Sequence, residues 1–313
     1  MKRWSVPLVV VAAGLAPWGW RAASGARAHR ATTLPTQAQE SATAAEPSEQ
    51  PPAVAVDDAE SAPATEMLPR AAKPTADEFA EIPDLTQTDP ELGLRGGGNS
   101  YCGPVAVSNS LMWLGRARCP GLIPEGENPK QQQIELVHRL SSNRYMGTSW
   151  KSGTGGIGLL RGLHRYLEHH GCAYRRLRYQ GWRGHPREFT TGVKVPDLDW
   201  IRAGVERGGA SWINVGWYQQ SDGGRAYRRN GGHWLTVVAP GRDGAALILH
   251  DPAPYAGTDF ANELVRAERI DSGWLIEQKA AFPARGYHRL TGGMHVKREG
   301  ELAILDGAVV LDL

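Results

Sequence analysis

The stretch NSYCGP, residues 99–104, leads directly into the apolar run VAVSNSLMWL, residues 105–114. Pro104 stands in the first turn of the expected helix, where an N–H group would have no intrahelical acceptor in any case. Gly115 follows the apolar run and is a residue type that commonly ends helices. The pattern therefore predicts a largely buried helix that begins at Cys102 and ends near Leu114.

A cysteine at the beginning of a helix can be interpreted in two ways. The positive end of the helix dipole lowers the pKa of a thiol and favours the nucleophilic thiolate. Alternatively, Cys102 is a small buried hydrophobic residue, as free cysteines usually are. The choice between these interpretations depends on residues elsewhere in the chain.

The N-terminal residues have the pattern of an export signal. A charged pair, Lys2-Arg3, precedes an apolar run over residues 6–16, and Ala26-Arg27-Ala28 fits a small-x-small cleavage site. We expect residues 1–28 to be a signal peptide and the protein to be secreted or periplasmic, with an uncleaved N-terminal anchor as the alternative. The apolar run is short for a membrane span, and no later stretch approaches spanning length, so we expect no stable membrane span after cleavage.

The composition changes after the signal. Residues 29–80 are dominated by Ala, Pro, Glu, Thr, Ser and Gln and contain no Phe, Trp or Tyr before Phe79. Such a segment cannot bury enough apolar surface to offset the entropy of ordering it, so we interpret it as a disordered linker. Residues 81–313 are then the folded domain, which is long enough for a substantial core.

Helices are predicted before strands in this domain. The predicted helices cover residues 102–114, 129–140, 156–170 and 197–207, with a further one at 261–270. The predicted strands cover residues 173–179, 211–218, 233–239 and 245–250, and residues 302–313 are expected to complete the sheet. This order indicates an α+β architecture with helices on one side of an antiparallel sheet.

Two of these strands carry a second pair of chemically suited residues. His233 begins one strand and Asp251 follows the next, with a turn at residues 240–244 between them. In an antiparallel hairpin these two residues lie at the same edge, where a carboxylate can orient an imidazole that activates a thiol. The alternative is a structural histidine at a strand edge beside an Asp-Pro turn.

Three motifs together resemble a known family. YCGPVA (101–106), GHWLTVV (232–238) and Asp251-Pro252 occur in the order found in papain-like cysteine peptidases, in particular the bacteriocin-processing (double-glycine leader) peptidases. The resemblance covers residues 95–255. It implies a papain-like α+β fold with the catalytic cysteine at a helix N-terminus, and no metal or organic cofactor. It assigns Cys102 as the nucleophile, His233 as general base and acid, and Asp251 as the residue that orients His233.

The sequence departs from this family at one position. Such enzymes commonly place a glutamine shortly before the cysteine to donate a hydrogen bond to the oxyanion, but the corresponding residue here is Gly96. Asn99 carries the same amide group and either replaces the glutamine or is a plain turn residue. The loss of one oxyanion donor lowers the rate about 100-fold to 1000-fold.

The other cysteines and a histidine cluster also allow two interpretations each. In an exported protein Cys119 and Cys172 can form a disulfide that leaves Cys102 free, or they can remain two thiols. His164, His169 and His170 lie near one helix end, where a metal site would need further ligands at fixed spacing. We interpret them as a solvated helix end and expect no metal.

These observations predict an exported cysteine hydrolase that cleaves peptide or amide bonds through a thioester acyl-enzyme. The alternatives are a transglutaminase-like acyltransferase and a catalytically silent binding module. The net charge of +2, with basic residues scattered along the chain, gives no indication of nucleic-acid binding. We expect a monomer that acts on a peptide or protein substrate.

Overall fold

A computed structural model describes residues 81–241, 243–253, 263–296 and 298–313. These residues belong to one compact unit. The predicted signal peptide (1–28) and linker (29–80) lie outside the described residues. All of the described residues belong to the predicted domain, residues 81–313.

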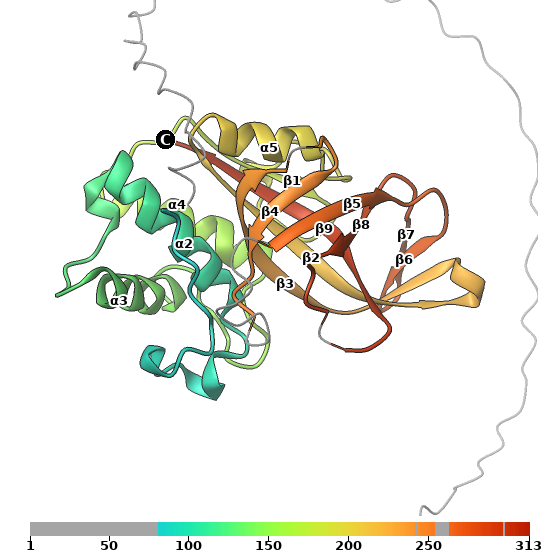
Figure 1. Cartoon of the computed structure of the whole chain (residues 1–313), viewed down its shortest axis with the longest axis horizontal. Helices are drawn as coiled ribbons and strands as arrows, with labels where there is room; N and C mark the ends of the chain where they lie inside the picture. Colours follow the sequence, from blue (N-terminus) through green and yellow to red (C-terminus); the bar gives the residue numbers. More distant parts are fainter. Residues whose placement is uncertain (1–80, 242, 254–262, 297) are drawn as a thin grey trace, which may run out of the picture. The chain divides into compact units, whose positions relative to one another are not determined.

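Six antiparallel strands close on themselves to form a barrel (Figure 1). Each strand is hydrogen-bonded to the next, and the ring closes where the last strand pairs with the first. In ring order the strands are β2 (Ala210–Ser221), β3 (Ala226–Pro240), β4 (Ala246–His250), β5 (Glu263–Arg269), β8 (His288–Gly292) and β9 (Glu301–Asp312). A hydrophobic cluster with members from all six strands, such as Val215, Leu235 and Leu305, fills the barrel.

Three further strands extend the barrel at two places. β1 (Arg176–Gly181) pairs with β9, and β6 (Trp274–Glu277) runs parallel to the first part of β3. β7 (Ala280–Pro283) forms an antiparallel pair with β6. β3 and β9 therefore each carry a strand outside the ring as well as their two partners within it.

Three of the four α-helices among the described residues gather on one side of the barrel (Figure 1). They are α2 (Cys102–Ala117), α3 (Pro129–Ser141) and α4 (Gly156–His169), whereas α5 (Leu198–Glu206) packs against β2, β3 and β9. Short 3₁₀ helices occupy residues 90–92, 95–98, 120–122, 187–189 and 222–224.

Helix α2 is attached to the barrel through side chains of β2 and β3. The indole nitrogen of Trp212 donates to the carbonyl oxygen of Ala106 at 3.0 Å, and the hydroxyl of Thr236 donates to the same oxygen at 2.8 Å. Residues 102–115 of α2 are all buried. The beginning of this helix is therefore held at a fixed position above β3, the strand that carries His233.

The local sequence signals located most helices and strands correctly. The helix beginnings predicted at Cys102, at residue 129 and at Gly156 are confirmed, and the helix predicted at 197–207 is α5. Asn128 accepts a hydrogen bond from the backbone of Gln131, and Pro129 occupies the first turn of α3, which is the expected chemistry of a helix beginning. The predicted strands correspond to β1, β2, β3, β4 and β9.

The predicted fold class is wrong. We expected a papain-like α+β fold with helices on one side of an antiparallel sheet, but the sheet closes into a six-stranded barrel with four short helices around it. Two strands that complete the ring were missed: residues 263–269 were predicted as part of a helix, and residues 288–292 carried no clear pattern. β9 then closes the ring by pairing with β2 rather than ending an open sheet.

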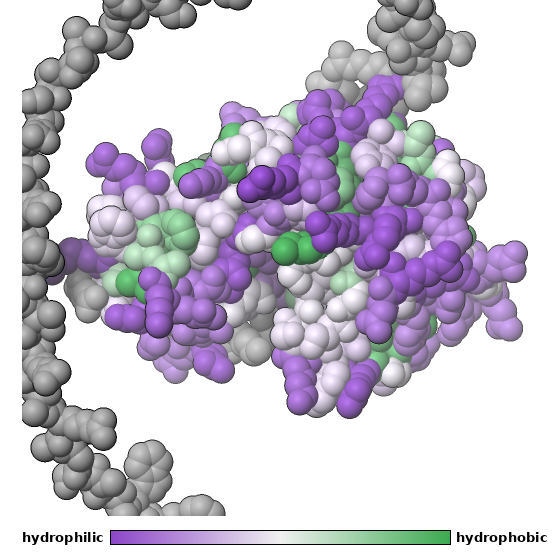
Figure 2. Space-filling model, turned by 180° about the vertical axis from the view of Figure 1, so that it is seen from behind, coloured by the Kyte–Doolittle hydropathy of each residue, from purple (hydrophilic) through white to green (hydrophobic). Residues whose placement is uncertain are grey.

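Apolar side chains are concentrated in the interior of the molecule. On the face shown in Figure 2 hydrophilic residues predominate and hydrophobic ones form only small separate patches. Within the described ranges, no helix combines the length and the apolar composition that crossing a bilayer requires.

Candidate active site

Cys102 is the first residue of α2 and is buried, with 8% of its surface exposed. Three successive glycines with positive φ, residues 96–98, bring the chain to this position. At Gly98 a Cβ atom would lie 1.8 Å from the carbonyl oxygen of Gln87, and φ is +77°, so no other residue type fits without rearrangement. Because Gly98 has no side chain, the backbone at Gln87 can pack closely against the segment that precedes Cys102.

His233 lies on β3, next to β2. Its carbonyl oxygen accepts a hydrogen bond from the side-chain amide of Asn214 at 3.1 Å, and its imidazole stacks on Trp217, with 5.9 Å between the ring centres. Both neighbours are buried residues of β2. The imidazole is consequently held between the barrel wall and the beginning of α2.

Asp251 directly follows β4, whose pairing with β3 brings it to His233. The hairpin register places Thr236 opposite His250, and the Oδ1 atom of Asp251 lies 2.5 Å from Nε2 of His233. The same oxygen accepts a hydrogen bond from the backbone nitrogen of Ala253 at 2.9 Å. Because Nε2 faces the carboxylate, Nδ1 is the ring nitrogen that remains for the thiol.

The cysteine and the histidine interact electrostatically. Burial alone would raise the pKa of the Cys102 thiol, but a hydrogen bond from His233 and its charge outweigh burial, with help from the backbone N–H groups of Trp234 and Gly103. The pKa of the thiol is therefore lowered. Burial also disfavours a charged imidazole, yet the Asp251 carboxylate and the thiol raise the pKa of His233 to about 10. These opposite shifts favour a thiolate–imidazolium pair.

The three predicted catalytic residues are thus brought together by three different elements: a helix beginning, a strand, and the residue after the next strand. Cys102 and His233 open into a cleft of about 590 Å³. The cleft is bounded by residues 151–157 on the side of α4 and by Asn214 and Trp217 on the side of the barrel. Both polar and apolar residues line it, and it is large enough for a stretch of peptide or another small molecule.

Asn99, the predicted oxyanion donor, also lines this cleft. Its side-chain nitrogen donates to the carbonyl oxygen of Gly96 at 3.0 Å, and the residue is exposed. One of its two N–H bonds is therefore engaged in the local turn. This geometry agrees with the turn interpretation and still leaves one N–H bond at the rim of the cleft.

Gln87 is a cleft residue that sequence reasoning missed. It is 3% exposed, lines the cleft together with Cys102, and its side-chain oxygen accepts no hydrogen bond from the described residues. Its backbone nitrogen donates to the carbonyl oxygen of Pro252 at 2.9 Å, which ties it to the residue after Asp251. The glycine run at 96–98 is the one local signal that bears on this contact, because successive glycines allow a sharp turn or a close approach of another segment, but it does not identify that segment.

Cys119 and Cys172 form a disulfide that joins the segment after α2 to the segment after α4, with 6.1 Å between their Cα atoms. Cys102 is the free cysteine of the three in the sequence. A reagent specific for thiols therefore reports on Cys102 alone.

Three other histidines of the described residues have structural contacts. Tyr174 hydrogen-bonds to Nδ1 of His164, and Tyr145 to Nδ1 of His169, each at 2.8 Å. His250 contacts the carbonyl oxygen of Pro83 through Nδ1 at 3.0 Å. Across the described ranges, no group of three or more His, Cys, Asp or Glu side chains is placed to hold a metal ion.

Two more carboxylates, those of Glu263 and Asp84, lie near Asp251. Burial is the largest influence that raises the pKa of Glu263, at the beginning of β5, to about 8, and the nearby carboxylates of Asp84 and Asp251 add to it. His295 approaches Glu263 at 3.5 Å. Burial and the Asp251 carboxylate likewise raise the pKa of Asp84, whereas His250 lowers it.

The chain matches no protein-family model, no curated protein and no solved structure. The resemblance to cysteine peptidases therefore rests on the three motifs, and the chemistry of the site has to be argued from its geometry.

Proposed function

We propose that this protein is a cysteine hydrolase that cleaves a peptide or amide bond by nucleophilic catalysis. The observation that carries the proposal is the chain of contacts from Cys102 to His233 and from His233 to Asp251. These contacts lower the pKa of Cys102 and raise the pKa of His233. A structural cysteine does not need an imidazole to ionise it, and a structural histidine does not need a buried carboxylate at 2.5 Å.

The reaction proceeds in two halves. The Cys102 thiolate attacks the substrate carbonyl carbon, and the tetrahedral intermediate collapses as His233 donates its proton to the departing amine. The product of this half is a thioester on Cys102. A water molecule then gives its proton to His233 and attacks the thioester, which releases the carboxylic acid and restores the thiolate.

Asp251 has a positioning role in both halves. Its carboxylate holds the imidazole by Nε2, so that Nδ1 faces the sulfur, and it stabilises the imidazolium. The backbone N–H groups of Gly103 and Trp234 face the sulfur as well and stabilise its negative charge.

We further propose that the protein works outside the cytoplasm, as the N-terminal pattern predicts. The disulfide between Cys119 and Cys172 supports this location, because structural disulfides persist in oxidising compartments and are rare in the cytosol.

The test is the rate of alkylation of Cys102 by iodoacetamide between pH 5 and pH 10, followed by intact mass. An ordinary thiol has a pKa of about 8.5 and reacts slowly at pH 6. We expect the full chain to react roughly 100-fold faster at pH 6 than its His233→Ala variant, because His233 maintains the thiolate.

His164→Ala is the matched control. His164 contacts Tyr174 and Glu168, so its substitution should leave the alkylation profile of Cys102 unchanged. Alkylation of the wild type that rises only near pH 8.5, with no effect of His233→Ala, would show that Cys102 is not activated and would overturn the proposal. Release of an amide product in place of an acid when an amine is added would identify acyl transfer instead of hydrolysis.

A further inference from the structure

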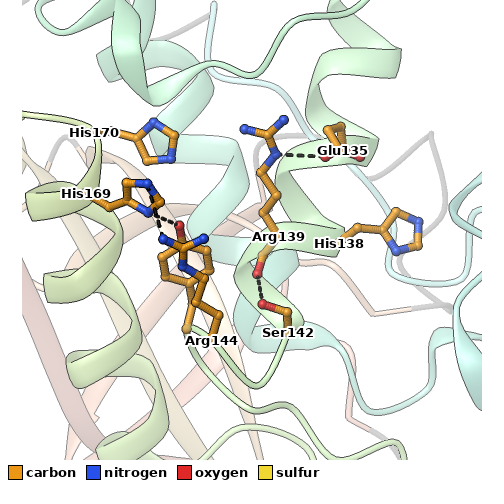
Figure 3. A pocket seen from close by; sticks show the side chains of 8 residues that line it. Glu135, His138, Arg139, Ser142, Arg144, His169 and His170 are labelled. Atoms are coloured by element: carbon orange, nitrogen blue, oxygen red, sulfur yellow. Dashed lines mark hydrogen bonds and ion pairs between the residues drawn. The ribbon is translucent and has the colours of Figure 1, made fainter.

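A second cavity, of about 450 Å³, lies between the C-terminal ends of α3 and α4 (Figure 3). We call it the His–Arg pocket, after His138 and Arg139 of α3, Arg144 of the following loop, and His169 and His170 at the end of α4. Among the described residues, those that line it do not line the catalytic cleft. It is therefore a separate site, and its function is independent of the hydrolase proposal.

Positive charge exceeds negative charge in this pocket. Of the described side chains that line it, two are arginines, three are histidines and one, Glu135, is a carboxylate. Glu135 contacts Nε of Arg139 at 2.7 Å. Figure 3 shows this contact at the inner nitrogen, with the two terminal nitrogens of the guanidinium extending beyond it. An arginine in this arrangement can still donate a pair of hydrogen bonds to an anion.

Arg144 is held by a weak acceptor. Its Nη2 atom lies 3.3 Å from Nε2 of His169, and the hydroxyl of Tyr145 lies 2.8 Å from Nδ1 of the same ring. Because a guanidinium can only donate, Nε2 of His169 accepts this hydrogen bond. An anionic oxygen is a stronger acceptor for Arg144 than an imidazole lone pair.

The adjacent His170 shows the effect of the excess charge. Burial is the largest influence that lowers the pKa of its imidazole, and His169, Arg139 and Arg144 lower it further by repulsion between positive groups. Its ring packs against that of Tyr166 at a tilt of 35°, with 4.3 Å between the ring centres. An anion placed among these side chains would relieve the repulsion.

We propose that the His–Arg pocket binds a phosphate-type oxyanion through the guanidinium groups of Arg139 and Arg144, next to the imidazoles of His169 and His170. A guanidinium group can donate a pair of hydrogen bonds to the oxygens of a phosphoryl or sulfate group, and this pocket contains two of them. The volume of the pocket is within the range of small-molecule sites, so the phosphoryl group of a small phosphorylated compound fits as well as free phosphate does.

Isothermal titration calorimetry on the full chain tests this binding, with inorganic phosphate, sulfate and phenyl phosphate as probes and chloride as the background anion. We expect saturable binding of phosphate to one site, weakened tenfold or more by Arg144→Gln or Arg139→Gln. Each substitution removes charge-assisted hydrogen bonds to the anion, and a tenfold loss of affinity corresponds to about 1.4 kcal/mol.

Arg161→Gln is the matched control, because Arg161 lies on α4, is exposed, and pairs with Glu188 outside the pocket. It should bind phosphate as the wild type does. Histidine NMR resonances follow the same titration, and those of His169 and His170 should move with phosphate in the wild type and in Arg161→Gln.

Phenyl phosphate that binds as tightly as phosphate supports a phosphorylated small molecule as the occupant, and binding of inorganic phosphate alone supports the free anion. Absence of saturable binding of all three probes to the wild type would overturn the proposal. Equal affinity in the wild type and in a folded Arg139→Gln/Arg144→Gln double variant would also overturn it. Neither result bears on Cys102, whose alkylation should be the same in all these variants.

Discussion

Gln87 and Asn99 offer two side-chain amides to the cleft that contains Cys102, and they differ in what else they contact. Asn99 is exposed and donates to the carbonyl oxygen of Gly96, whereas Gln87 is buried and lines the same cleft as Cys102. An oxyanion donor works best when it is already fixed and shielded from water. By that criterion Gln87 is the better donor, although it is distant from Cys102 in the sequence.

Replacement of Gln87 by Met, which keeps the length of the side chain but removes its N–H donors, should separate two reactions of Cys102. Acylation by p-nitrophenyl acetate passes through a tetrahedral oxyanion and should slow by roughly 100-fold to 1000-fold. Alkylation by iodoacetamide forms no oxyanion and should change by only a few-fold. Both rates can be measured on the same sample.

Asn99→Ala serves as the comparison for this prediction. It should leave acylation and alkylation close to the wild-type rates because Asn99 is committed to the turn at Gly96. If Asn99→Ala slows acylation and Gln87→Met does not, the oxyanion role belongs to Asn99.

The proximity of the three candidate catalytic residues was accessible to sequence reasoning for a physical reason. Cys102 is marked by the helix that begins there, and His233 and Asp251 lie in one hairpin, so short-range rules of strand pairing predict their proximity. Gln87 is different, because its place depends on contact between residues 87 and 252, which no local pattern encodes.

Helix α4 connects the two cavities, since its first residue lines the cleft and its last lines the His–Arg pocket. Gly162, near its middle, faces the loop that precedes it. A Cβ atom at this position would lie 2.6 Å from Cγ of Met146 and 2.7 Å from the backbone nitrogen of the same residue. The absence of a side chain at Gly162 allows the helix and the loop to pack this closely.

Gly162→Ala should therefore lower the free energy of unfolding by roughly 1–3 kcal/mol, as overpacked cores do. Alanine gains about 1 kcal/mol in helix propensity over glycine, but that gain is smaller than the cost of displacing a backbone. Urea unfolding followed by circular dichroism measures the difference.

Gly184→Ala is the control, because nothing lies within 4 Å of the added Cβ and the backbone there suits alanine. It should be neutral or slightly stabilising. An unfolding midpoint of Gly162→Ala at or above that of the wild type would contradict the packing described at Met146.

Elements with capping signals were predicted well, and β5 shows where that approach fails. The segment ELVRAER, residues 263–269, has good intrinsic helix formers and was predicted as helix, yet it is a strand between β4 and β8. Its pattern of burial alternates at Glu263, Leu264 and Val265. Tertiary pairing outweighs propensities that amount to less than about 1 kcal/mol per residue.

At the scale of the whole molecule, the free energy of unfolding should depend on pH through Glu263. Its pKa is raised to about 8 in the folded protein, from an ordinary value of 4.5. Between these values the folded state retains a proton that the unfolded state releases, so this residue makes the protein less stable as pH rises from 5 to 8. The contribution is roughly 1–4 kcal/mol, at about 1.4 kcal/mol per pKa unit.

Glu263→Gln should remove this dependence, which can be measured as the difference in urea unfolding between the variant and the wild type at pH 5 and pH 8. The variant should gain stability relative to the wild type as the pH rises. Glu268→Gln, an exposed position on the same strand, should show no such trend. A difference between Glu263→Gln and wild type that stays constant with pH would mean that Glu263 is already ionised at pH 5.

Barrel closure is the part of the architecture that the sequence did not reveal. Pairing of β9 with β2 joins segments such as Ser211 and Val310, and nothing in either segment specifies the other as its partner. Side chains alternate between the two faces of each strand in the same way in an open sheet and in a closed barrel. The hydrophobic patterns could therefore identify strands but not whether the sheet closes.

Closure also has a consequence in time. β9 pairs with β1, β2 and β8, and it follows all of them in the chain. β1 and β2 are far from β9 in the sequence, and their pairing with β9 is slow because the entropy of the long intervening loop is lost before the contacts form. While a ribosome is still making β9, Cys102, His233 and Asp251 have all been synthesised, but the barrel that aligns them cannot yet close. The nascent chain would carry an ordinary, slowly reacting thiol until its final strand is in place.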